Sequence, residues 1–224
     1  LNISAKIRFK IKSKNRLTFS IDYICFFKFY SKLHMINIVL FGPPGAGKGT
    51  QAEFLKLKFN LFHISTGDVF RFNIKNNTPL GLMAKSYIDK GDLVPDQVTI
   101  DMLSEVVRKN LDSNGFIFDG FPRTNKQALA LDTLMFENNS TISAMIALEV
   151  DDKVLISRLL ERGKTSGRID DSNEVIIQNR ISEYYKKTAI LKSFYLKKNR
   201  YFGVDGQGSI EHITDRLSSV IESL

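Results

Sequence analysis

The sequence predicts one α/β protein in which a five-stranded parallel sheet is flanked by helices. Five short apolar runs alternate with longer segments of helical pattern, as expected for parallel strands joined by right-handed crossovers. The 224 residues are enough for one well-buried domain with small insertions. A hydrophobic content of 43% and a charged content of 25% are ordinary for a globular protein. No apolar run approaches the roughly 18 residues of a membrane helix, so no membrane is expected as a partner.

Residues 1–34 carry most of the positive charge. Eight Lys and Arg residues and one Asp give them a net charge of +7, against +8 for the whole chain. Residues 35–224 are therefore nearly neutral, and nucleic acid is not an expected partner. We expect Met35 to be the native start and residues 1–34 to lie outside the fold, although a mitochondrial transit peptide is the alternative. The single cysteine, Cys25, allows neither an intrachain disulfide nor a Cys-rich zinc site, and it favours a cytoplasmic setting.

A glycine-rich loop separates the first expected strand, Ile36–Leu40, from the first expected helix, Gln51–Phe59. The loop reads Gly42-Pro43-Pro44-Gly45-Ala46-Gly47-Lys48-Gly49-Thr50. A strand, a glycine loop and a helix in this order form an anion site, because the loop amides point inward and the helix N-terminus adds partial positive charge. We expect positive φ angles at Gly45, Gly47 and Gly49, which bring the backbone close to a phosphate. Lys48 is expected to reach the β- and γ-phosphates of a nucleotide.

The next elements follow from caps and prolines. Leu61–Ile64 is an apolar strand, and Ser65 then supplies N-cap chemistry for a helix that carries Arg71. Two further helices, each opened by a proline, are expected at Pro79–Lys90 and Pro95–Asn110. A turn over residues 91–94 joins them.

The third strand, Phe116–Asp119, is a buried pattern that ends in an acid. An acid in this place is expected to hold Mg²⁺, directly or through water, although a cap for the following loop is the alternative. A helix over Thr124–Phe136 and an internal parallel strand over Ala144–Val150 follow. Ligands of such sheets bind beyond the carboxyl ends of the strands, so Gly42, Ser65 and Asp119 are expected at one edge.

The last part of the chain concentrates cations in an irregular segment. A helix over Asp152–Arg162, a polar loop over 163–173, and a long helix to about Lys198 are expected, followed by a strand at Tyr201–Val204 and a helix at Ser209–Ser223. The cations of this segment are Arg162, Lys164, Arg168 and Arg180. Four cations around a glycine-containing loop in a nearly neutral body favour a polyphosphate partner. Gly163 and Gly167 are candidate flexible points.

Taken together, these motifs resemble the nucleoside monophosphate kinases, and the adenylate kinase family above all. The resemblance covers residues 36–224 and rests on the phosphate loop, Ser65–Asp68 with Arg71, Asp92–Val94, Asp119–Arg123 with Gln127, and the arginine-rich loop. It implies the P-loop fold and a monomer that transfers a phosphoryl group from ATP to AMP with Mg²⁺, giving two ADP. It also implies an NMP-binding insertion at about 65–94 and a lid at about 161–173. Because the lid is short, the chain resembles the zinc-free type.

The resemblance assigns the site residues as well. It implies an ATP site at Gly45, Ala46, Gly47, Lys48, Gly49, Thr50, Arg162 and Gly208, with Gly208 near the adenine. It implies an AMP site at Thr66, Arg71, Asp92, Leu93, Val94, Gly120, Phe121, Pro122, Arg123, Gln127, Arg168 and Arg180. The catalytic residues would be Lys48, Asp119, Arg123, Arg162 and Arg168. The metal would be held by Thr50 and by Asp119 through water.

Two other functions are compatible with parts of the sequence. A UMP/CMP kinase of the same fold is the near alternative. The resemblance implies AMP at Thr66, where pyrimidine-specific relatives tend to carry alanine, and Gln127 can offer both a donor and an acceptor to adenine. A surface-helix glutamine is the alternative interpretation of Gln127. A basic nucleic-acid-binding module is disfavoured, because aromatic residues interleaved with Lys occur only in residues 1–34. His63 is expected in the core, and Tyr184 and Tyr185 are expected to pack against the sheet.

Overall fold

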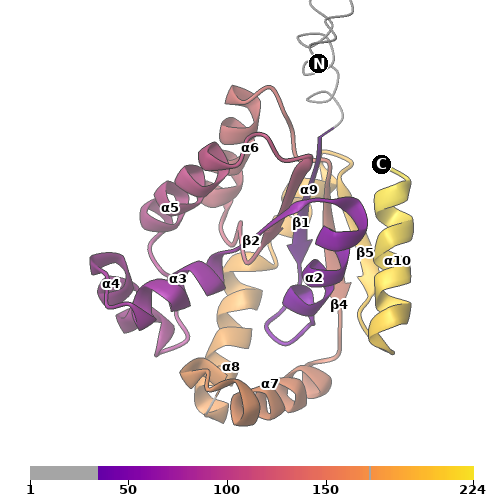
Figure 1. Ribbon diagram of the computed structural model, residues 1–224. Coiled ribbons are helices and arrows are strands. Elements are labelled where there is room, and N and C mark those ends of the chain that lie inside the picture. The colour runs from indigo at the N-terminus through magenta and orange to yellow at the C-terminus, as the bar shows by residue number, and fades with distance from the viewer. Residues whose placement is uncertain (1–34, 172) are drawn as a thin grey trace, which may run out of the picture.

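The computed structural model describes residues 35–171 and 173–224. Its five strands form one parallel sheet in the order β2-β3-β1-β4-β5 (Figure 1). The strands are β1 (Ile36–Phe41), β2 (Phe62–Ser65), β3 (Gly115–Asp119), β4 (Ala144–Glu149) and β5 (Tyr201–Asp205). Each strand begins and ends within about one residue of its expected range, so the predicted sheet is confirmed. The predictions for residues 1–34 lie outside the described residues.

Helices cover both faces of the sheet. They are α2 (Lys48–Phe59), α3 (Thr66–Lys75), α4 (Pro79–Ile88), α5 (Asp96–Lys109), α6 (Asn125–Glu137), α7 (Asp152–Ser166), α8 (Glu174–Glu183), α9 (Leu191–Leu196) and α10 (Ile210–Glu222). Figure 1 shows α2 and α10 on one side of the sheet and α5 and α6 on the other. Ser65 and Thr124 cap their helices as expected, and Ser209 also caps α10, since each side chain accepts a backbone N–H of the first helical turn.

The side chains of β1 alternate between two cores, as the two-residue period of a strand requires. Ile38 and Leu40 pack in the core beneath α2, α7 and α10, whereas Val39 and Phe41 pack in the core beneath α5, α6 and α9. The sheet is therefore buried on both faces, as expected for parallel strands. This burial fixes the carboxyl ends of β1 and β3, from which two parts of the site project.

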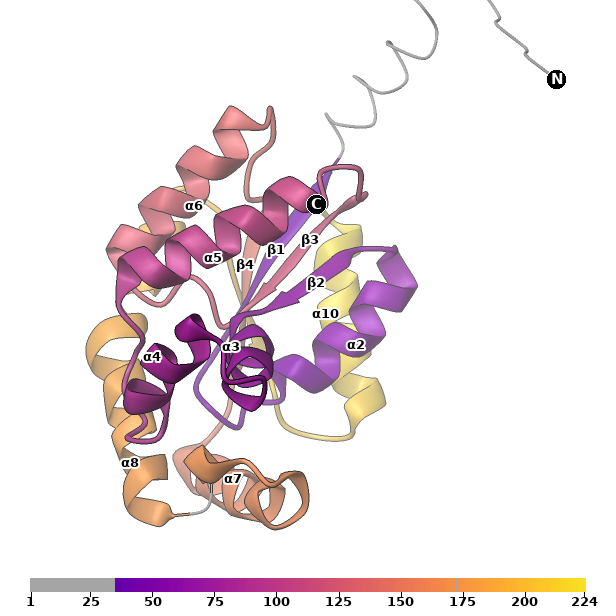
Figure 2. The same cartoon turned by 60° about the vertical axis from the view of Figure 1, so that its left-hand side comes forward.

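A third, smaller core belongs to the insertion that carries α3 and α4. Its buried side chains are Phe70, Ala84, Val94 and Met102. Because this core is separate from the two cores of the sheet, α3 and α4 form a distinct lobe. Figure 2 shows this lobe and α7 at the same end of the sheet.

Some local predictions about helices and loops were wrong. Gly49 lies in the first turn of α2 and has no positive φ, because the helix begins at Lys48, whereas Gly45 and Gly47 have φ angles of +85° and +94°. The helix that starts at Asp152 runs through Gly163 to Ser166, so the first four residues of the expected polar loop are part of α7. Only at Gly167, with φ +63°, does the helix end in the left-handed conformation that favours glycine.

The expected long helix to Lys198 is also interrupted. After α8, a π-helical turn covers Tyr184–Thr188, with Ala189 N–H donating to the Tyr184 carbonyl at 2.8 Å. A separate helix, α9, follows. In this turn Tyr184 packs on Phe41 of β1, with ring centroids 5.6 Å apart, as the prediction of packing against the sheet requires. Tyr185 instead lies at the surface and donates to Asp152.

The described helices include none with both the length and the apolar character needed to cross a bilayer.

Candidate active site

A cleft of about 490 Å³ lies at the carboxyl ends of the strands. It is bounded by the glycine loop, the α3–α4 insertion, the loop after β3, and the segment from α7 to the π-helical turn. Of the predicted site residues, the cleft is lined by Gly45, Gly47, Lys48, Gly49, Thr50, Thr66, Arg71, Asp92, Leu93, Val94, Asp119, Gly120, Phe121, Pro122, Arg123, Gln127, Arg162, Arg168 and Arg180. Residues more than 130 positions apart in the chain thus meet around one space, as the topology of parallel strands predicts.

Two predicted site residues do not line the cleft. The Ala46 side chain is buried in the core beneath α2, and its backbone N–H donates to the Pro43 carbonyl at 3.2 Å. Gly208 lies in the loop between β5 and α10, outside the residues that line the cleft. Its place near an adenine ring therefore stays a prediction.

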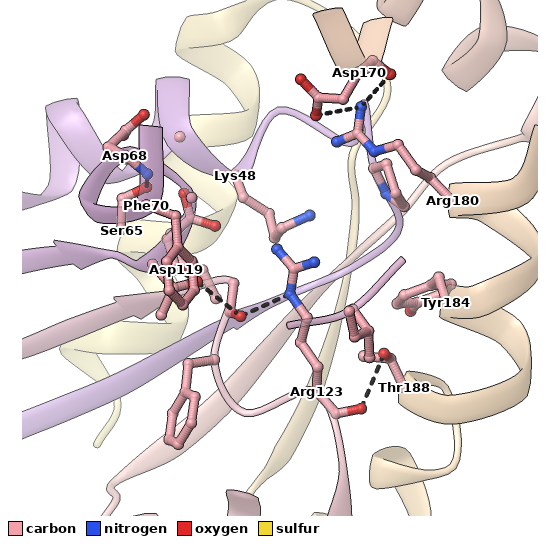
Figure 3. A pocket seen from close by; sticks show the side chains of 18 of the residues that line it. Lys48, Ser65, Asp68, Phe70, Asp119, Arg123, Asp170, Arg180, Tyr184 and Thr188 are labelled. Carbon is pink, nitrogen blue, oxygen red and sulfur yellow. Dashed lines mark hydrogen bonds and ion pairs between the residues drawn. The ribbon is translucent and has the colours of Figure 1, made fainter. Parts of the chain in front are cut away.

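Lys48 folds back over the glycine loop. Its ammonium donates to the carbonyls of Gly42 and Pro43 at 2.7 and 2.9 Å. Burial lowers the pKa of Lys48 to about 8; the nearby Asp119 opposes this shift, and Arg123 adds to it. The direction of these effects indicates that Lys48 shares its space with other cations, and Figure 3 shows the ends of Lys48 and Arg123 pointing into the same region.

Asp119 ends β3 beside the glycine loop. Its Oδ2 lies 3.5 Å from the position that a Cβ on Gly49 would occupy. Burial alone would raise the pKa of Asp119, but His63, Lys48 and Arg123 together hold it below its usual value. The carboxyl is therefore ionised at neutral pH, close to the place where the loop would hold phosphate oxygens.

His63 is a residue of the cleft that the sequence analysis missed. Its side chain is 9% exposed and lines the cleft, with Nε2 3.8 Å from Asp119 Oδ2 and Nδ1 3.2 Å from Glu53 Oε1. Burial would lower the pKa of His63, but Asp119 and Glu53 raise it above the usual value. The alternation of apolar and polar residues along β2 could not indicate that His63 faces the cleft. His63 lies on an edge strand, and its partner Asp119 comes from the neighbouring strand β3.

Arg123 is held on three sides in the loop after β3. Its Nε donates to the Gly120 carbonyl at 2.7 Å, and its backbone N–H donates to Gln127 Oε1 at 2.7 Å. Its carbonyl accepts from the Thr188 hydroxyl at 3.0 Å (Figure 3). The Gly120 carbonyl also accepts from Thr66 Oγ1 at 3.0 Å, so the first turn of α3 is tied to the same loop. This arrangement fixes the guanidinium within the cleft before any ligand binds.

The cations of the α7–α8 segment are held by two acids that the sequence analysis did not assign. The Asp171 side chain is fully buried and accepts from Arg162 Nε at 2.6 Å and Nη2 at 3.0 Å, and it also pairs with Arg180 Nη1. Asp170 Oδ2 lies 3.0 Å from Arg180 Nη1. Burial would raise the pKa of Asp171, but Arg162 and Arg180 hold it below its usual value. The sequence feature that could have indicated this role is the pair of adjacent acids, Asp170 and Asp171, inside an arginine-rich segment.

A second acidic contact joins the α7–α8 segment to the insertion. Arg168 Nη2 lies 3.6 Å from Asp68 Oδ1, and the same carboxylate pairs with Arg71 at 2.5 Å. The turn after α4 contacts α8, where Asn179 Nδ2 donates to the Lys90 carbonyl at 2.8 Å. Both walls of the cleft therefore contact each other through polar groups.

Gln127 is not a surface glutamine, as one interpretation of the sequence allowed. It is 2% exposed, it lines the cleft, and both ends of its amide are hydrogen-bonded within the protein. The acceptor is used by Arg123 N–H, and the donor is used by Asp96.

Chemically, the cleft combines an amide-lined anion cradle, one ionised carboxylate and a group of cations on facing walls. Such a set can hold two phosphorylated ligands with their phosphate groups toward each other and can neutralise their mutual repulsion.

Comparison with known proteins agrees with this chemistry. A family model described as adenylate kinase matches residues 40–200. The adenylate kinase of Flavobacterium psychrophilum is 62% identical over 190 residues, which are 85% of this chain and the full length of that relative. The adenylate kinase of Flavobacterium johnsoniae is 59% identical over the same extent. That of Micrococcus luteus is 43% identical over 190 residues, which are 92% of its length.

Proposed function

This chain belongs to the adenylate kinase family, and on that premise we propose that it transfers a phosphoryl group reversibly from ATP to AMP, giving two ADP. One observation carries the proposal: the lysine of the glycine loop and the arginines of three other segments line a single cleft. An enzyme that joins two nucleotides through their phosphates needs cations on both sides of the moving group.

ATP binds at the glycine loop. The backbone amides of the loop and the N-terminus of α2 hold the β- and γ-phosphates, and Lys48 turns from its two carbonyl partners to reach them. Arg162 approaches the same phosphates from α7. Because burial lowers the pKa of Lys48, a bound polyphosphate would stabilise its ammonium form.

AMP binds between the insertion and the loop after β3. Arg123, Arg71, Arg168 and Arg180 surround its phosphate, in line with the γ-phosphate of ATP. Its base is held between the turn over 92–94, Thr66 and Gln127, all of which line the cleft.

Mg²⁺ is the cofactor that the family generally uses with ATP, and the residues present fit it. Mg²⁺ prefers one or two carboxylates, phosphate oxygens and several waters to a cage made wholly of protein ligands. Asp119 is such a carboxylate, since it is ionised and lies beside the glycine loop. Thr50, in the first turn of α2, supplies a hydroxyl. The described residues hold no group of three His, Cys, Asp or Glu side chains that would form a complete cage. When bound, the metal offsets the charge that develops on the phosphate oxygens.

The protein's own contribution is position and charge. The arginines offset the negative charge of the phosphates, so the attacking oxygen of AMP can approach the γ-phosphorus of ATP. We place the lid at residues 161–173, which include the last turns of α7 and the short 3-10 turn Ile169–Asp171. Asp171 of the lid holds Arg162, and both Asp170 and Asp171 hold Arg180 of α8. Closure of the lid and of the 65–94 insertion over the nucleotides excludes water, which would otherwise compete with AMP as the acceptor.

The acceptor is tested by comparing AMP, UMP, CMP and GMP with ATP and Mg²⁺ in a coupled assay of ADP formation. AMP is expected to give the highest kcat/KM. A higher kcat/KM for UMP or CMP would instead establish the pyrimidine kinase as the function.

The proposal extends to the setting of the enzyme. We place it in the cytoplasm as a monomer that needs no zinc and has ATP, AMP and ADP, not nucleic acid, as its partners. Its nearly neutral body after residue 34 and its single cysteine support this setting. Light scattering coupled to size-exclusion chromatography tests the monomer: a mass of about twice 25.5 kDa would contradict it.

A further inference from the structure

Gln127 has one fixed partner at each end of its side-chain amide. Oε1 accepts from the backbone N–H of Arg123 at 2.7 Å, and Nε2 donates to Asp96 Oδ1 at 2.8 Å. The side chain is buried at the wall of the cleft, whereas Asp96 lies behind it and is not among the residues that line the cleft.

These two partners allow only one orientation of the amide. A backbone N–H can only donate, and a carboxylate can only accept. Rotation of the amide by 180° would bring its NH₂ group against the Arg123 N–H and its oxygen against the Asp96 carboxylate. Both mismatches would be buried, so the rotated orientation is strongly disfavoured.

Asp96 is itself held in place. Its second oxygen, Oδ2, accepts from Thr124 Oγ1 at 2.9 Å, and Asp96 stands in the first turn of α5, where the helix dipole favours a carboxylate. The carboxylate therefore joins α5 to the start of α6 and keeps one oxygen directed at Gln127.

The fixed amide still has one lone pair on Oε1 and one proton on Nε2 to offer to a ligand. A 6-aminopurine such as adenine matches this pair, since its amino group donates and its N1 accepts. A 6-oxopurine has the reverse pattern, because its O6 accepts and its N1–H donates. We propose that Asp96 is a specificity-determining positioning residue, which locks the Gln127 amide and so makes the cleft select a 6-aminopurine nucleotide over a 6-oxopurine nucleotide as acceptor. The inference rests on the proposed function, since it concerns the base of AMP.

The test compares two acceptors in one variant. Asp96→Asn keeps the size of the side chain but can either accept from or donate to Gln127, so the rotated amide regains a partner. Acceptor kcat/KM is measured with AMP and with inosine 5′-monophosphate, the 6-oxo counterpart, at saturating ATP and Mg²⁺. Dissociation constants of both nucleotides, measured by calorimetry without ATP, give a second readout that does not depend on turnover.

The AMP-to-IMP ratio of kcat/KM is expected to fall by about tenfold or more in Asp96→Asn, the scale of one hydrogen bond to a charged group. Selectivity is reduced and not abolished, because Arg123 N–H still favours the original orientation. The ratio is independent of the fraction of folded enzyme, so partial unfolding cannot imitate the result. Asp101→Asn is the matched control, since Asp101 on the same helix accepts from the Gln97 amide at 2.9 Å at the surface; its ratio should not change.

Each outcome is decisive. A ratio within about twofold of the original in Asp96→Asn, whether both activities are kept or both fall together, overturns the role of Asp96. Loss of ratio in Asp101→Asn would overturn it too, because a remote carboxylate would then have the same effect. If the unaltered protein does not phosphorylate AMP at all, the proposed function itself fails, and that result is separate from any change in ratio.

Discussion

Asp171 is the residue on which the arrangement of Arg162 and Arg180 depends most. Its side chain is 0% exposed, and it pairs with Arg162 and Arg180. Asp171→Asn keeps the shape but removes the charge and presents an NH₂ group to one of the two guanidinium donors. Removing one partner of a buried ion pair typically costs about 3–5 kcal/mol. Because the Arg162 side chain is 35% exposed, water screens part of the loss, and we expect the free energy of unfolding to fall by about 2–3 kcal/mol.

The effect on catalysis should be larger than the effect on stability. Misplacing a catalytic group by about 1 Å can lower turnover about 10²-fold, and here two arginines are released together. The assays are urea unfolding followed by circular dichroism and coupled ADP formation under conditions where the variant is folded. Asp132→Asn, which removes the ion-pair partner of Lys198 and does not line the cleft, is the control and should alter the free energy of unfolding by at most about 1 kcal/mol.

The pH dependence gives a further check on Asp171. Because its pKa is lowered in the folded state, its stabilising effect is present above the ordinary carboxyl pKa and is lost as the pH falls through the folded value. The difference in stability between the original protein and Asp171→Asn should therefore shrink below about pH 4. If Asp171→Asn unfolds at the same urea concentration and keeps turnover within threefold, the role given to this carboxylate is wrong.

Three other predictions concern the rest of the cleft. Thr188→Val removes the hydroxyl that donates to the Arg123 carbonyl; turnover should fall about fivefold, and Thr188→Ser should restore it. Gly163→Ala should lower the free energy of unfolding by about 1–3 kcal/mol, because the added Cβ would lie 2.4 Å from the Asp171 carbonyl oxygen. The Cβ of Gly167→Ala would meet nothing within 4 Å, so this variant should lose only about 1 kcal/mol, through backbone strain. Equal shifts in the melting temperature of the two variants would contradict this. For Lys48, whose pKa is lowered to about 8, kcat/KM for ATP should fall as the pH rises through that value, because the ammonium loses its charge; a flat profile from pH 7 to 9.5 would show that the charge is not needed.

The sequence predicted the sheet because its signals were local. Each strand is a short apolar run, and the caps at Ser65 and Thr124 mark two of the helix starts. The glycine loop could be placed because strand, loop and helix are contiguous. Gly49 was assigned the wrong conformation because the helix begins at Lys48, three residues before the expected start at Gln51, and so includes Gly49.

The parts that could not be predicted depend on contacts distant in the chain. The π-helical turn brings Thr188 to the carbonyl of Arg123, 65 residues away, and no periodicity encodes that contact. His63 reaches Asp119 only because β2 and β3 are neighbours in the sheet. The acids Asp170 and Asp171 were overlooked because charged residues in a polar segment are usually solvated, and only the folded structure shows that they are buried.

The central claim is that one cleft holds two nucleotides and passes a phosphoryl group between them without releasing it to water. The most direct measurement follows ATP, AMP, ADP and inorganic phosphate together in a reaction of the full chain with Mg²⁺. The account predicts two ADP formed for each AMP consumed, no phosphate released, and no consumption of ATP when AMP is left out. Consumption of ATP without AMP, with phosphate as the product, would contradict it.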